Sequence, residues 1–479
     1  MRDECALTPH PSSLIPLEMS RSKRFSSMMR GSIGGMRRVA GYASGKVRAR
    51  RQRKREERSR ELTRVNGARR VVITGIGAIT CLGLSLQETW GAMVAGKSGI
   101  GPVTRFDASH LPVRIAGEIK GFDASKYIDQ KELRRTARVS HVAVAAAQEA
   151  YQTSGLQIGK DVQHDRVGVI MGTAMGGFEM SESALADLRI GPRKMNPFAL
   201  PAALPNAPGH HISKVFGATG VLSTVVAACA SGTQSIGDAA EMIRRGKADA
   251  MFAGGVEAVI NESALAGFAL MRVLSTNNDD PTRAQRPFDI TRNGFVYSEG
   301  CVVMMLESLE VARGRGAHIY AEVLGLGVSS DAYHIAIPDP TASGAVRAMQ
   351  WAIEDAGVRP EDVDYVNAHG SATETNDPLE TKAIKLVFGE RAYDIPVSST
   401  KSMTGHAMGA SGSIEALATV MSLKTGILTP TINLNTPDPE CDLDYVPNVA
   451  RKDDIQVAVS NSFGLGGQNA SIVLARYEE

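Results

Sequence analysis

From residue 69 onward, apolar runs that suit buried strands alternate with amphipathic stretches that suit helices. Residues 69–80 (RRVVITGIGAIT) are rich in β-branched residues and contain turn-forming glycines, which predicts a buried strand. Residues 86–95 and 141–155 show helical patterns, and residues 166–177 predict a strand that meets a glycine turn. This alternation indicates an α/β protein whose mostly parallel sheets are covered by helices on both faces.

The segment 222–259 predicts a strand, a turn, a helix and a second strand, and it places Cys229 where the first strand meets the helix. The plan then repeats. Residues 321–331 predict a strand, residues 343–357 predict an amphipathic helix, and the next strand delivers His369 to its end. Two similar halves are therefore expected, with both residues at the carboxyl ends of strands, where functional groups gather in such sheets.

Composition narrows the class of protein. Of 479 residues, 43% are apolar and 48 are glycine, which excludes a wholly disordered chain. The 5 cysteines form no CxxC pair, so we expect a reducing compartment, no disulfide framework and no structural zinc. No stretch approaches the ~20 apolar residues that span a bilayer, and no compact apolar signal core begins the chain. We expect a soluble protein without membrane insertion.

Charge is distributed unevenly. Residues 1–70 hold 19 basic and 6 acidic side chains, a net charge of +13, whereas the remainder holds 34 basic and 45 acidic side chains, a net charge of −11. The most basic run, residues 48–64, has almost nothing apolar to bury, which indicates a solvated tail, an upstream start or a targeting segment. A nucleic-acid-binding arm is the alternative, but this run has no interleaved aromatics to stack on bases. We expect a basic, disordered extension over 1–68 and two folded halves over 69–320 and 321–479.

Cys229 is a candidate nucleophile. Free backbone N–H groups and the helix dipole at a helix N-terminus favour thiolate over thiol. The neighbouring Ala228, Ala230, Ser231 and Gly232 are small, which permits a sharp turn and leaves room for a substrate. The alternative is a structural cysteine buried in an alanine-rich segment.

Three further segments could meet Cys229 in space. They contain His369, the pair Lys401 and His406, and the glycine loop of residues 461–469. Each histidine could be structural, but both are flanked by small residues, and the loop glycines can bring backbone N–H groups close to an oxyanion. No phosphate loop, HExxH zinc site or strand-following GxGxxG occurs, so nucleotide hydrolysis and metal or dinucleotide chemistry are not expected.

Five ordered motifs carry a resemblance to a known family. They read AACASGTQSIGDA, NAHGSATETND, STKSMTGHAMGASGSIEA, PTINLNTPDPECDLDYVPN and NSFGLGG. Over about residues 70–476 the chain resembles the elongating β-ketoacyl-acyl-carrier-protein synthases. The resemblance implies a duplicated thiolase-like α/β fold, with five αβαβα layers and two mostly parallel or mixed sheets, that usually forms homodimers.

The resemblance also implies residue roles. Cys229 would accept the acyl group, and its backbone N–H with that of Leu465 would form the oxyanion hole. His369 and His406 would assist decarboxylation and stabilise the enolate, and Lys401 would be the supporting cation. The implied substrate-binding residues are Ser371, Thr373, Phe463 and Leu465.

Some positions depart from the family pattern, and for others the resemblance leaves the role undecided. Leu465 replaces the phenylalanine that usually gates the acyl pocket, so chain-length preference is open. Asp377 and Glu380 match acidic positions that are structural or ion-binding near Lys401. Cys301 and Cys441 lie in the wrong motifs for a second catalytic cysteine and are interpreted as core residues. Apart from the ion considered for Asp377 and Glu380, we expect no metal, and we expect no enzyme-bound cofactor.

These residue types suit a decarboxylative Claisen condensation. An acyl group held on Cys229 would react with malonyl-acyl carrier protein in fatty-acid elongation, since a thiolate both attacks and leaves thioesters readily. The alternative is a ketosynthase subunit of a type II polyketide or polyene pathway, with a heterodimeric partner. A non-catalytic chain-length-factor subunit is disfavoured because Cys229 and both histidines are present. We expect acyl carrier protein and a second copy of the chain as partners, and no nucleic acid. We expect the protein in the cytoplasm, or in a plastid or mitochondrion if residues 1–68 are a transit peptide.

Overall fold

The predicted strands and helices form at the expected places. The computed structural model describes residues 69–478, so the predicted extension over 1–68, with its targeting or nucleic-acid role, lies outside the described residues. In the first half the predicted elements are β1 (Val71–Thr80), α2 (Leu86–Val94), α4 (Arg138–Ser154), β4 (Val167–Gly172), β5 (Leu222–Val225), α8 (Ser231–Arg244) and β6 (Ala250–Glu257). In the second half they are β8 (Ala321–Ser330), α11 (Ser343–Asp355) and β9 (Tyr365–Asn367).

Other elements complete the sheet and its helical cover. The further strands are β2 (Gly101–Pro102), β3 (Ile115–Ala116), β7 (Gly300–Ser308), β10 (Val397–Ser398), β11 (Ile427–Leu428), β12 (Arg451–Lys452), β13 (Val457–Gly464) and β14 (Gln468–Ala475). The further helices are α3 (Gln130–Leu133), α5 (Phe178–Ile190), α6 (Ala199–Ala203), α7 (Ala207–Phe216), α9 (Glu262–Leu270), α10 (Leu309–Gly314), α12 (Asn376–Phe388), α13 (Lys401–Thr404) and α14 (Ser411–Thr425). Within residues 69–478, no helix is long and apolar enough to cross a membrane.

The two halves repeat one strand order. The first row of strands runs β5-β4-β6-β7-β1 and the second runs β10-β9-β13-β14-β8. In each row the first three strands are mutually parallel, and the fourth, β7 or β14, is antiparallel to both its neighbours. This repetition supports the predicted division of the folded chain into two halves, residues 69–320 and 321–479. The position of the boundary between them stays a prediction.

The two rows are joined, which corrects the expectation of two separate sheets. β1 and β8 pair antiparallel over residues 71–73 and 321–323, so ten strands form one continuous sheet. Each of these strands ends its own row, where its outer N–H and C=O groups would otherwise lack partners. This junction is short: β1 pairs with β8 over three residues only, whereas it pairs with β7 over nearly its whole length.

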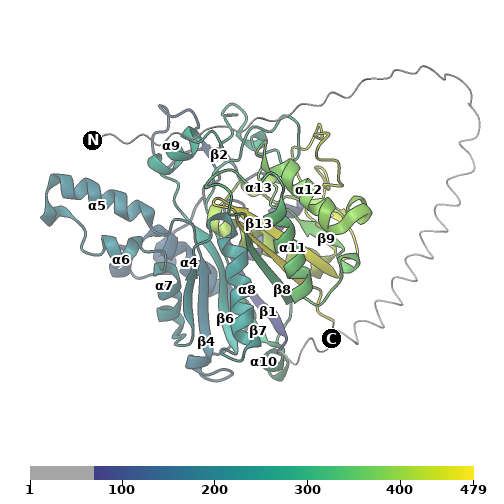
Figure 1. Cartoon of the computed structure of the whole chain (residues 1–479). Helices are drawn as coiled ribbons and strands as arrows, with labels where there is room; N and C mark the ends of the chain where they lie inside the picture. Colours follow the sequence, from purple (N-terminus) through teal and green to yellow (C-terminus); the bar gives the residue numbers. More distant parts are fainter. Residues whose placement is uncertain (1–68, 479) are drawn as a thin grey trace, which may run out of the picture. The chain divides into compact units, whose positions relative to one another are not determined.

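Helix α8 lies between the two rows (Figure 1), and α14 packs against it. α8 contacts β4 and β6 on one side and β8 and β14 on the other, and α14 contacts β7 and β13. α4 and α7 pack on the other face of the first row, and α11, with α12 beside it, covers the second. The layers therefore follow the order helix, strands, helix, strands, helix, and the predicted α/β fold class is confirmed.

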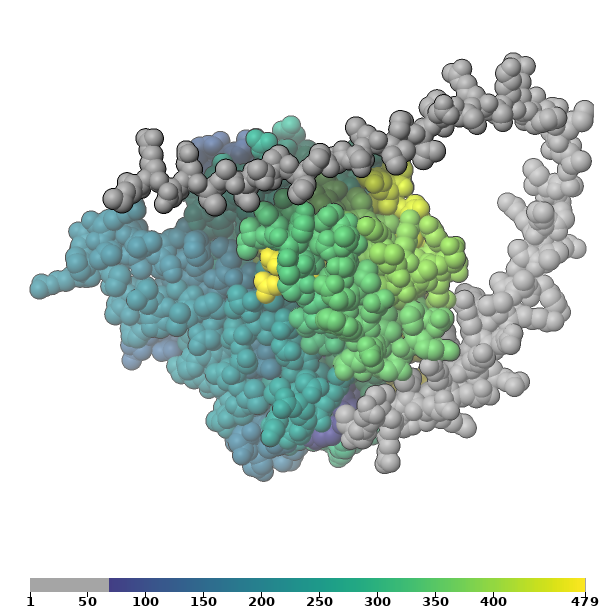
Figure 2. All heavy atoms as spheres, in the orientation of Figure 1, coloured from purple at the N-terminus to yellow at the C-terminus, as the bar shows by residue number. Residues whose placement is uncertain are grey.

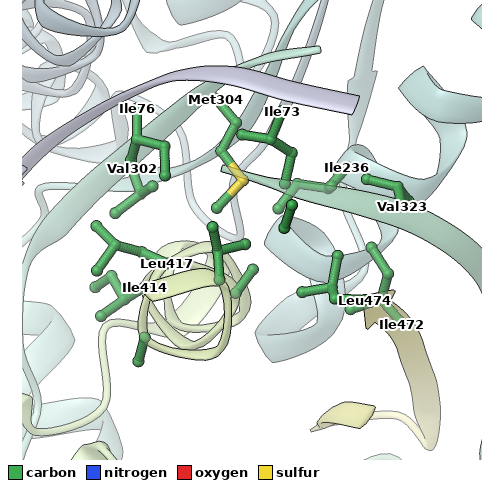
Figure 3. Packing of buried hydrophobic residues seen from close by; sticks show 14 of the residues in the cluster. Ile73, Ile76, Ile236, Val302, Met304, Val323, Ile414, Leu417, Ile472 and Leu474 are labelled. Atoms are coloured by element: carbon green, nitrogen blue, oxygen red, sulfur yellow. The ribbon is translucent and has the colours of Figure 1, made fainter. Parts of the chain in front are cut away.

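The largest core cluster surrounds the central helices (Figure 3). Ile73 and Val302 from the first row meet Leu417 from α14 and Leu474 from β14, and all four are buried. Each such side chain contributes about 1.5–3 kcal/mol on burial, so this cluster ties the two rows together. On the face drawn in space-filling form, a small yellow patch of the C-terminal chain lies between the teal and green parts (Figure 2).

Candidate active site

Cys229 lies at the predicted junction of strand and helix. β5 leads into a short 3₁₀ turn, η4 (Ala228–Ala230), and α8 begins directly after it. Ala228 has a φ of 47°, in the left-handed region that residues other than glycine rarely adopt, and such backbone conformations cluster at functional sites. The turn aims a buried Cys229 side chain at the second half of the molecule.

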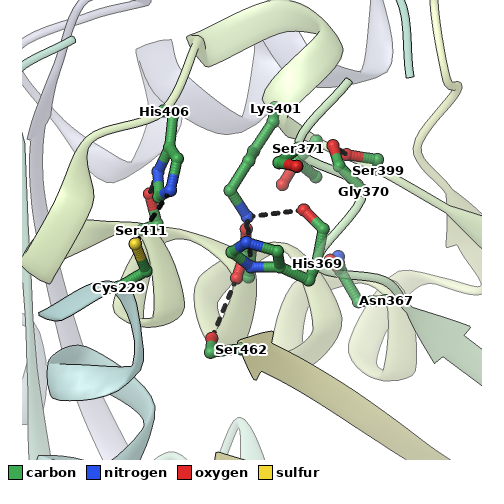
Figure 4. Close-up of polar contacts among 12 residues, drawn as sticks. Cys229, Asn367, His369, Gly370, Ser371, Ser399, Lys401, His406, Ser411 and Ser462 are labelled. Atoms are coloured by element: carbon green, nitrogen blue, oxygen red, sulfur yellow. Dashed lines mark hydrogen bonds and ion pairs between the residues drawn. The ribbon is translucent and has the colours of Figure 1, made fainter. Parts of the chain in front are cut away.

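The sulfur of Cys229 faces His406 (Figure 4). Its Sγ lies 3.1 Å from His406 Nε2. Burial raises the pKa of the thiol to about 11, although the backbone N–H of Leu465 and the charge of Lys401 both lower it. The helix N-terminus favours the thiolate, but desolvation of the sulfur acts in the opposite direction and is the largest cause of the raised pKa.

His406 is held on both sides of its ring. Its Nδ1 lies 2.8 Å from Ser411 Oγ, and the ring of Phe295 packs edge-on at a centroid distance of 4.9 Å. Burial and the nearby Lys401 ammonium hold the pKa of His406 well below its ordinary value. The imidazole is therefore neutral at physiological pH and has one N–H to donate.

His369 lies beside His406, with ring centroids 5.4 Å apart and planes nearly perpendicular. Lys401 Nζ donates to the backbone carbonyl of His369 at 2.7 Å and lies 3.3 Å from its Nδ1. Burial, followed by the charge of Lys401 and the neighbouring ring of His406, lowers the pKa of His369 well below its ordinary value. Because an ammonium can only donate, Nδ1 of His369 accepts and the ring proton resides on Nε2.

Lys401 is buried, and its charge is balanced by Glu415 in an ion pair. Ser462 Oγ donates to the second carboxylate oxygen of Glu415 at 3.3 Å (Figure 4). A buried ammonium without such a partner would cost several kcal/mol. Sequence analysis did not identify Glu415, although a single carboxylate in an otherwise uncharged helical segment, SIEALATV, was an available signal.

The glycine loop between β13 and β14 closes against the Cys229 turn. A Cβ on Gly464 would lie 3.2 Å from the backbone nitrogen of Cys229, so the absent side chain permits this approach. The backbone N–H of Leu465 reaches the sulfur and lowers the pKa of Cys229. Phe463, near the end of β13, lies with its ring centroid 5.9 Å from that of His369. The structure thus brings together the loop, Cys229 and both histidines.

Ser371 and Thr373 follow His369 along the chain. Their hydroxyl oxygens lie 3.1 Å apart, and Thr373 Oγ1 accepts the backbone N–H of Asn376. Ser371 is held further by Gln285, whose amide donates to its backbone carbonyl at 2.9 Å. Their binding of a phosphopantetheine arm stays a prediction.

Asp377 and Glu380 hold the backbone around His369. Glu380 accepts the backbone N–H groups of His369 and Gly370, and Asp377 accepts that of Phe288 at 2.8 Å. Their oxygens accept hydrogen bonds from the protein itself, which supports the structural alternative, and ion binding by these residues stays a prediction. Between residues 69 and 478, no group of three or more His, Cys, Asp or Glu side chains is arranged to hold a metal ion. The cation next to the site is Lys401, and its carboxylate partner is Glu415.

Cys301 and Cys441 are buried and belong to core clusters other than the one that contains Cys229. Both are free thiols. Their interpretation as core residues is confirmed.

Comparisons with known proteins identify the family. The family model for the β-ketoacyl synthase N-terminal domain matches residues 68–312, and that for the β-ketoacyl synthase C-terminal domain matches residues 320–435. A 3-oxoacyl-[acyl-carrier-protein] synthase 2 of Synechocystis sp. is 48% identical over 411 residues, which are 86% of this chain and 99% of that protein. The protein of the same name from Coxiella burnetii is 46% identical over 409 residues, or 85% of this chain and 99% of that protein.

Solved structures agree with this assignment. A type II polyketide ketosynthase in complex with its acyl-carrier protein superposes with a TM-score of 0.80 at 33% identity, and an ishigamide ketosynthase/chain length factor does so with 0.80 at 35%. A β-ketoacyl synthase from Burkholderia phymatum gives 0.80 at 36%. Each of the three matches covers 86% of this chain and 100% of the other. The resemblance carried by the five motifs is confirmed, and the chain belongs to the β-ketoacyl synthase family.

Proposed function

We propose that the protein condenses a Cys229-bound acyl group with malonyl-acyl carrier protein, with loss of CO2, to give a 3-oxoacyl-acyl carrier protein in fatty-acid elongation. The observation that carries this proposal is the convergence of Cys229, His406 and His369, with 3.1 Å from sulfur to imidazole and 5.4 Å between the imidazole rings. The curated relatives bear the name of this activity. The acyl groups arrive on the phosphopantetheine arm of the carrier, and no step needs a cofactor held by the enzyme.

In the first half-reaction Cys229 attacks the acyl thioester on the carrier. A bond forms between Sγ and the acyl carbon, the bond to the pantetheine sulfur breaks, and the proton of Cys229 ends on the departing sulfur. His406 Nε2, in contact with Sγ, stabilises the negative charge that develops there. The backbone N–H groups of Cys229 and Leu465 are suited to stabilise the oxyanion, since they are fixed in place before the reaction.

In the second half-reaction the malonyl thioester loses CO2. The electrons of the broken carbon–carbon bond form an enolate, which attacks the acyl carbon and displaces the Cys229 thiolate, and solvent then protonates the thiolate. Two neutral imidazoles can donate hydrogen bonds to the enolate oxygen as its charge develops. The lowered pKa values of His369 and His406 keep both in this neutral form.

The proposal is tested by mass spectrometry of the carrier. The protein is incubated with malonyl-carrier and with acyl-carriers of several lengths, and the expected product is a 3-oxoacyl-carrier two carbons longer than the acyl donor, with one CO2 released per product. Acylation without any elongated product at every chain length tested would contradict the proposed reaction.

A polyketide ketosynthase is the second candidate. Two of the similar structures are a type II polyketide ketosynthase and an ishigamide ketosynthase/chain length factor. Such an enzyme would need a second, different chain, and it would extend its product repeatedly. Activity of the purified chain alone, limited to one condensation per acyl-carrier, supports fatty-acid elongation. Activity only after addition of a chain-length-factor subunit supports the polyketide alternative.

A homodimer is supported by the edge of the sheet. β5 ends the first row and has a single neighbouring strand, β4, among the described residues. The adjoining side chains of Leu222 and Val226 are 46% and 52% exposed. An open apolar edge can pair with the same edge of a second copy across a two-fold axis. We expect a dimer by light scattering, and Leu222→Lys with Val226→Glu should shift it to monomer, whereas an unchanged dimer would place the interface elsewhere.

A further inference from the structure

Ser411 is the one described side chain that hydrogen-bonds the far nitrogen of His406. It is the first residue of α14, it is buried, and its Oγ lies 2.8 Å from His406 Nδ1. The serine at the matching place in the first half behaves differently. Ser231, which begins α8, accepts the backbone N–H of Ala227 and donates to the carbonyls of Ala228 and Thr173. Ser411 is therefore not required by the turn that it follows.

The direction of this hydrogen bond can be deduced. Among residues 69–478, Nδ1 of His406 is the single hydrogen-bond partner of Ser411 Oγ. A buried hydroxyl must donate its proton or pay the cost of an unsatisfied donor, and the available acceptor is the lone pair of Nδ1. If Ser411 accepted from Nδ1 instead, its own proton would be buried without a partner. The ring proton of His406 therefore resides on Nε2, which faces the sulfur of Cys229 at 3.1 Å.

We propose that Ser411 is a positioning residue that fixes His406 as the Nε2–H tautomer, with the N–H aimed at the sulfur of Cys229 and at the enolate. This inference rests on the proposed function, because the value of that N–H lies in the condensation. Ser411 acts through His406 and itself touches neither Cys229 nor any reacting atom.

The two histidines reach the same tautomer through different partners. His369 is fixed by the Lys401 ammonium, 3.3 Å from its Nδ1, whereas His406 is fixed by a hydroxyl. A change at residue 411 should therefore release His406 alone and leave His369 as it is. This separation makes the proposal testable in one molecule.

The first test is ¹⁵N NMR of the unmodified, histidine-labelled enzyme, with the His406 signals assigned by their loss in His406→Gln. We expect Nδ1 of His406 to resonate as an unprotonated nitrogen and Nε2 as a protonated one. In Ser411→Ala we expect a new population with the proton on Nδ1, while the His369 signals stay unchanged. A protonated Nδ1 in the unmodified enzyme would overturn the proposal even if no variant folds.

The second test is kinetic and uses Ser411→Ala, Ser411→Thr and the control Ser413→Ala. Ser413 lies on the same turn of α14 and is equally buried, but its hydroxyl donates to the carbonyls of Ala410 and Gly255. We expect malonyl decarboxylation to fall about tenfold in Ser411→Ala and to be largely restored in Ser411→Thr. The Ser413→Ala rate should stay within about twofold of the unmodified rate.

Equal loss in Ser411→Ala and Ser413→Ala, or no loss in Ser411→Ala, would overturn the positioning role. These outcomes are distinct from failure of the proposed function, in which the unmodified enzyme forms no 3-oxoacyl product. The NMR measurement needs no substrate, so it judges the tautomer whichever reaction the enzyme catalyses.

Discussion

Each half of the molecule contains the same kind of backbone turn before a helix, but the two turns carry different residues. In the first half, β5 leads through η4 to α8, and in the second, a 3₁₀ turn, η8 (Met408–Ala410), leads to α14. The first residues of the two turns, Ala228 and Met408, have φ values of 47° and 42°. Both turns continue with the sequence Ala-Ser-Gly. At the central position of the turn, one half carries Cys229 and the other carries Gly409.

The difference arises from what surrounds each turn. A Cβ on Gly409 would lie 2.4 Å from the backbone nitrogen of Ala174, so the second turn has no room for a side chain. Its backbone N–H donates instead to the buried carboxylate of Glu257. The functional side chain next to the second turn is that of His406, three residues before Gly409, and it reaches across to Cys229. A repeated turn therefore supplies a fixed backbone, and packing decides which of its positions can carry chemistry.

The largest effect on activity is expected from removing the thiol of Cys229 in the first turn. Cys229→Ala should lower condensation by more than about 10⁴-fold, because no acyl-enzyme can form, while the fold is retained. Intact-protein mass spectrometry of the unmodified enzyme should show one acyl group, mapped to Cys229. Acylation at Cys301 or Cys441 would contradict the assignment.

The histidines should separate the two half-reactions. His369→Ala and His406→Ala should each still accept an acyl group at Cys229, but CO2 release from malonyl-carrier should fall by about 10²–10³-fold, since each removes a donor to the enolate. The measurement is labelled CO2 release alongside acyl-enzyme formation. Normal decarboxylation in both variants would contradict the proposed role of the two histidines in the second half-reaction.

The buried thiol predicts an unusual pH profile. With a pKa of about 11, a smaller fraction of Cys229 is thiolate at pH 8 than for a thiol with the ordinary value of 9.0. The difference is about a hundredfold, so alkylation by iodoacetamide should be slower by this factor and should rise with pH up to about 11. A midpoint below 9 would show that the helix N-terminus outweighs burial after all.

The second turn should not tolerate a side chain at its central position, Gly409. Gly409→Ala should reduce the free energy of unfolding by about 1–3 kcal/mol, because the added methyl group meets the backbone of residues 173 and 174. Chemical denaturation measures this, and Ala230→Gly provides a control in the first turn. Unchanged stability in Gly409→Ala would show that this loop moves freely and that the two turns differ for another reason.

The smallest effect is expected at the glycine loop. Leu465 is shorter than phenylalanine and lacks its flat ring, so it should seal an acyl tunnel less completely. A side chain of this size is worth about 1.5–3 kcal/mol on burial, and only part of this should differ between substrates. Leu465→Phe should therefore shift the relative kcat/KM among acyl-carrier lengths by about tenfold at most, with the backbone N–H retained. Identical length profiles in both proteins would exclude residue 465 as a gate.

Much of the fold was accessible from the sequence because its signals are local. A β-branched run, a cluster of small residues and a glycine stop determine a strand, a turn and a helix within a few residues, and this placed Cys229 at the junction of β5 and α8. The family motifs extended this reading to His369, Lys401 and His406, which the structure brings together.

Other properties were decided only by tertiary structure, because they depend on what packs against each residue. The continuity of the sheet depends on three residue pairs between β1 and β8, far apart in sequence. The thiol pKa depends on desolvation, which reverses the shift expected from the helix terminus. The choice of Glu415 over Asp377 or Glu380 as the partner of Lys401 depends on which carboxylate faces the ammonium. Sequence by itself determined which elements form and which reactive groups they carry; long-range packing determined the partner, the protonation state and the free space of each group.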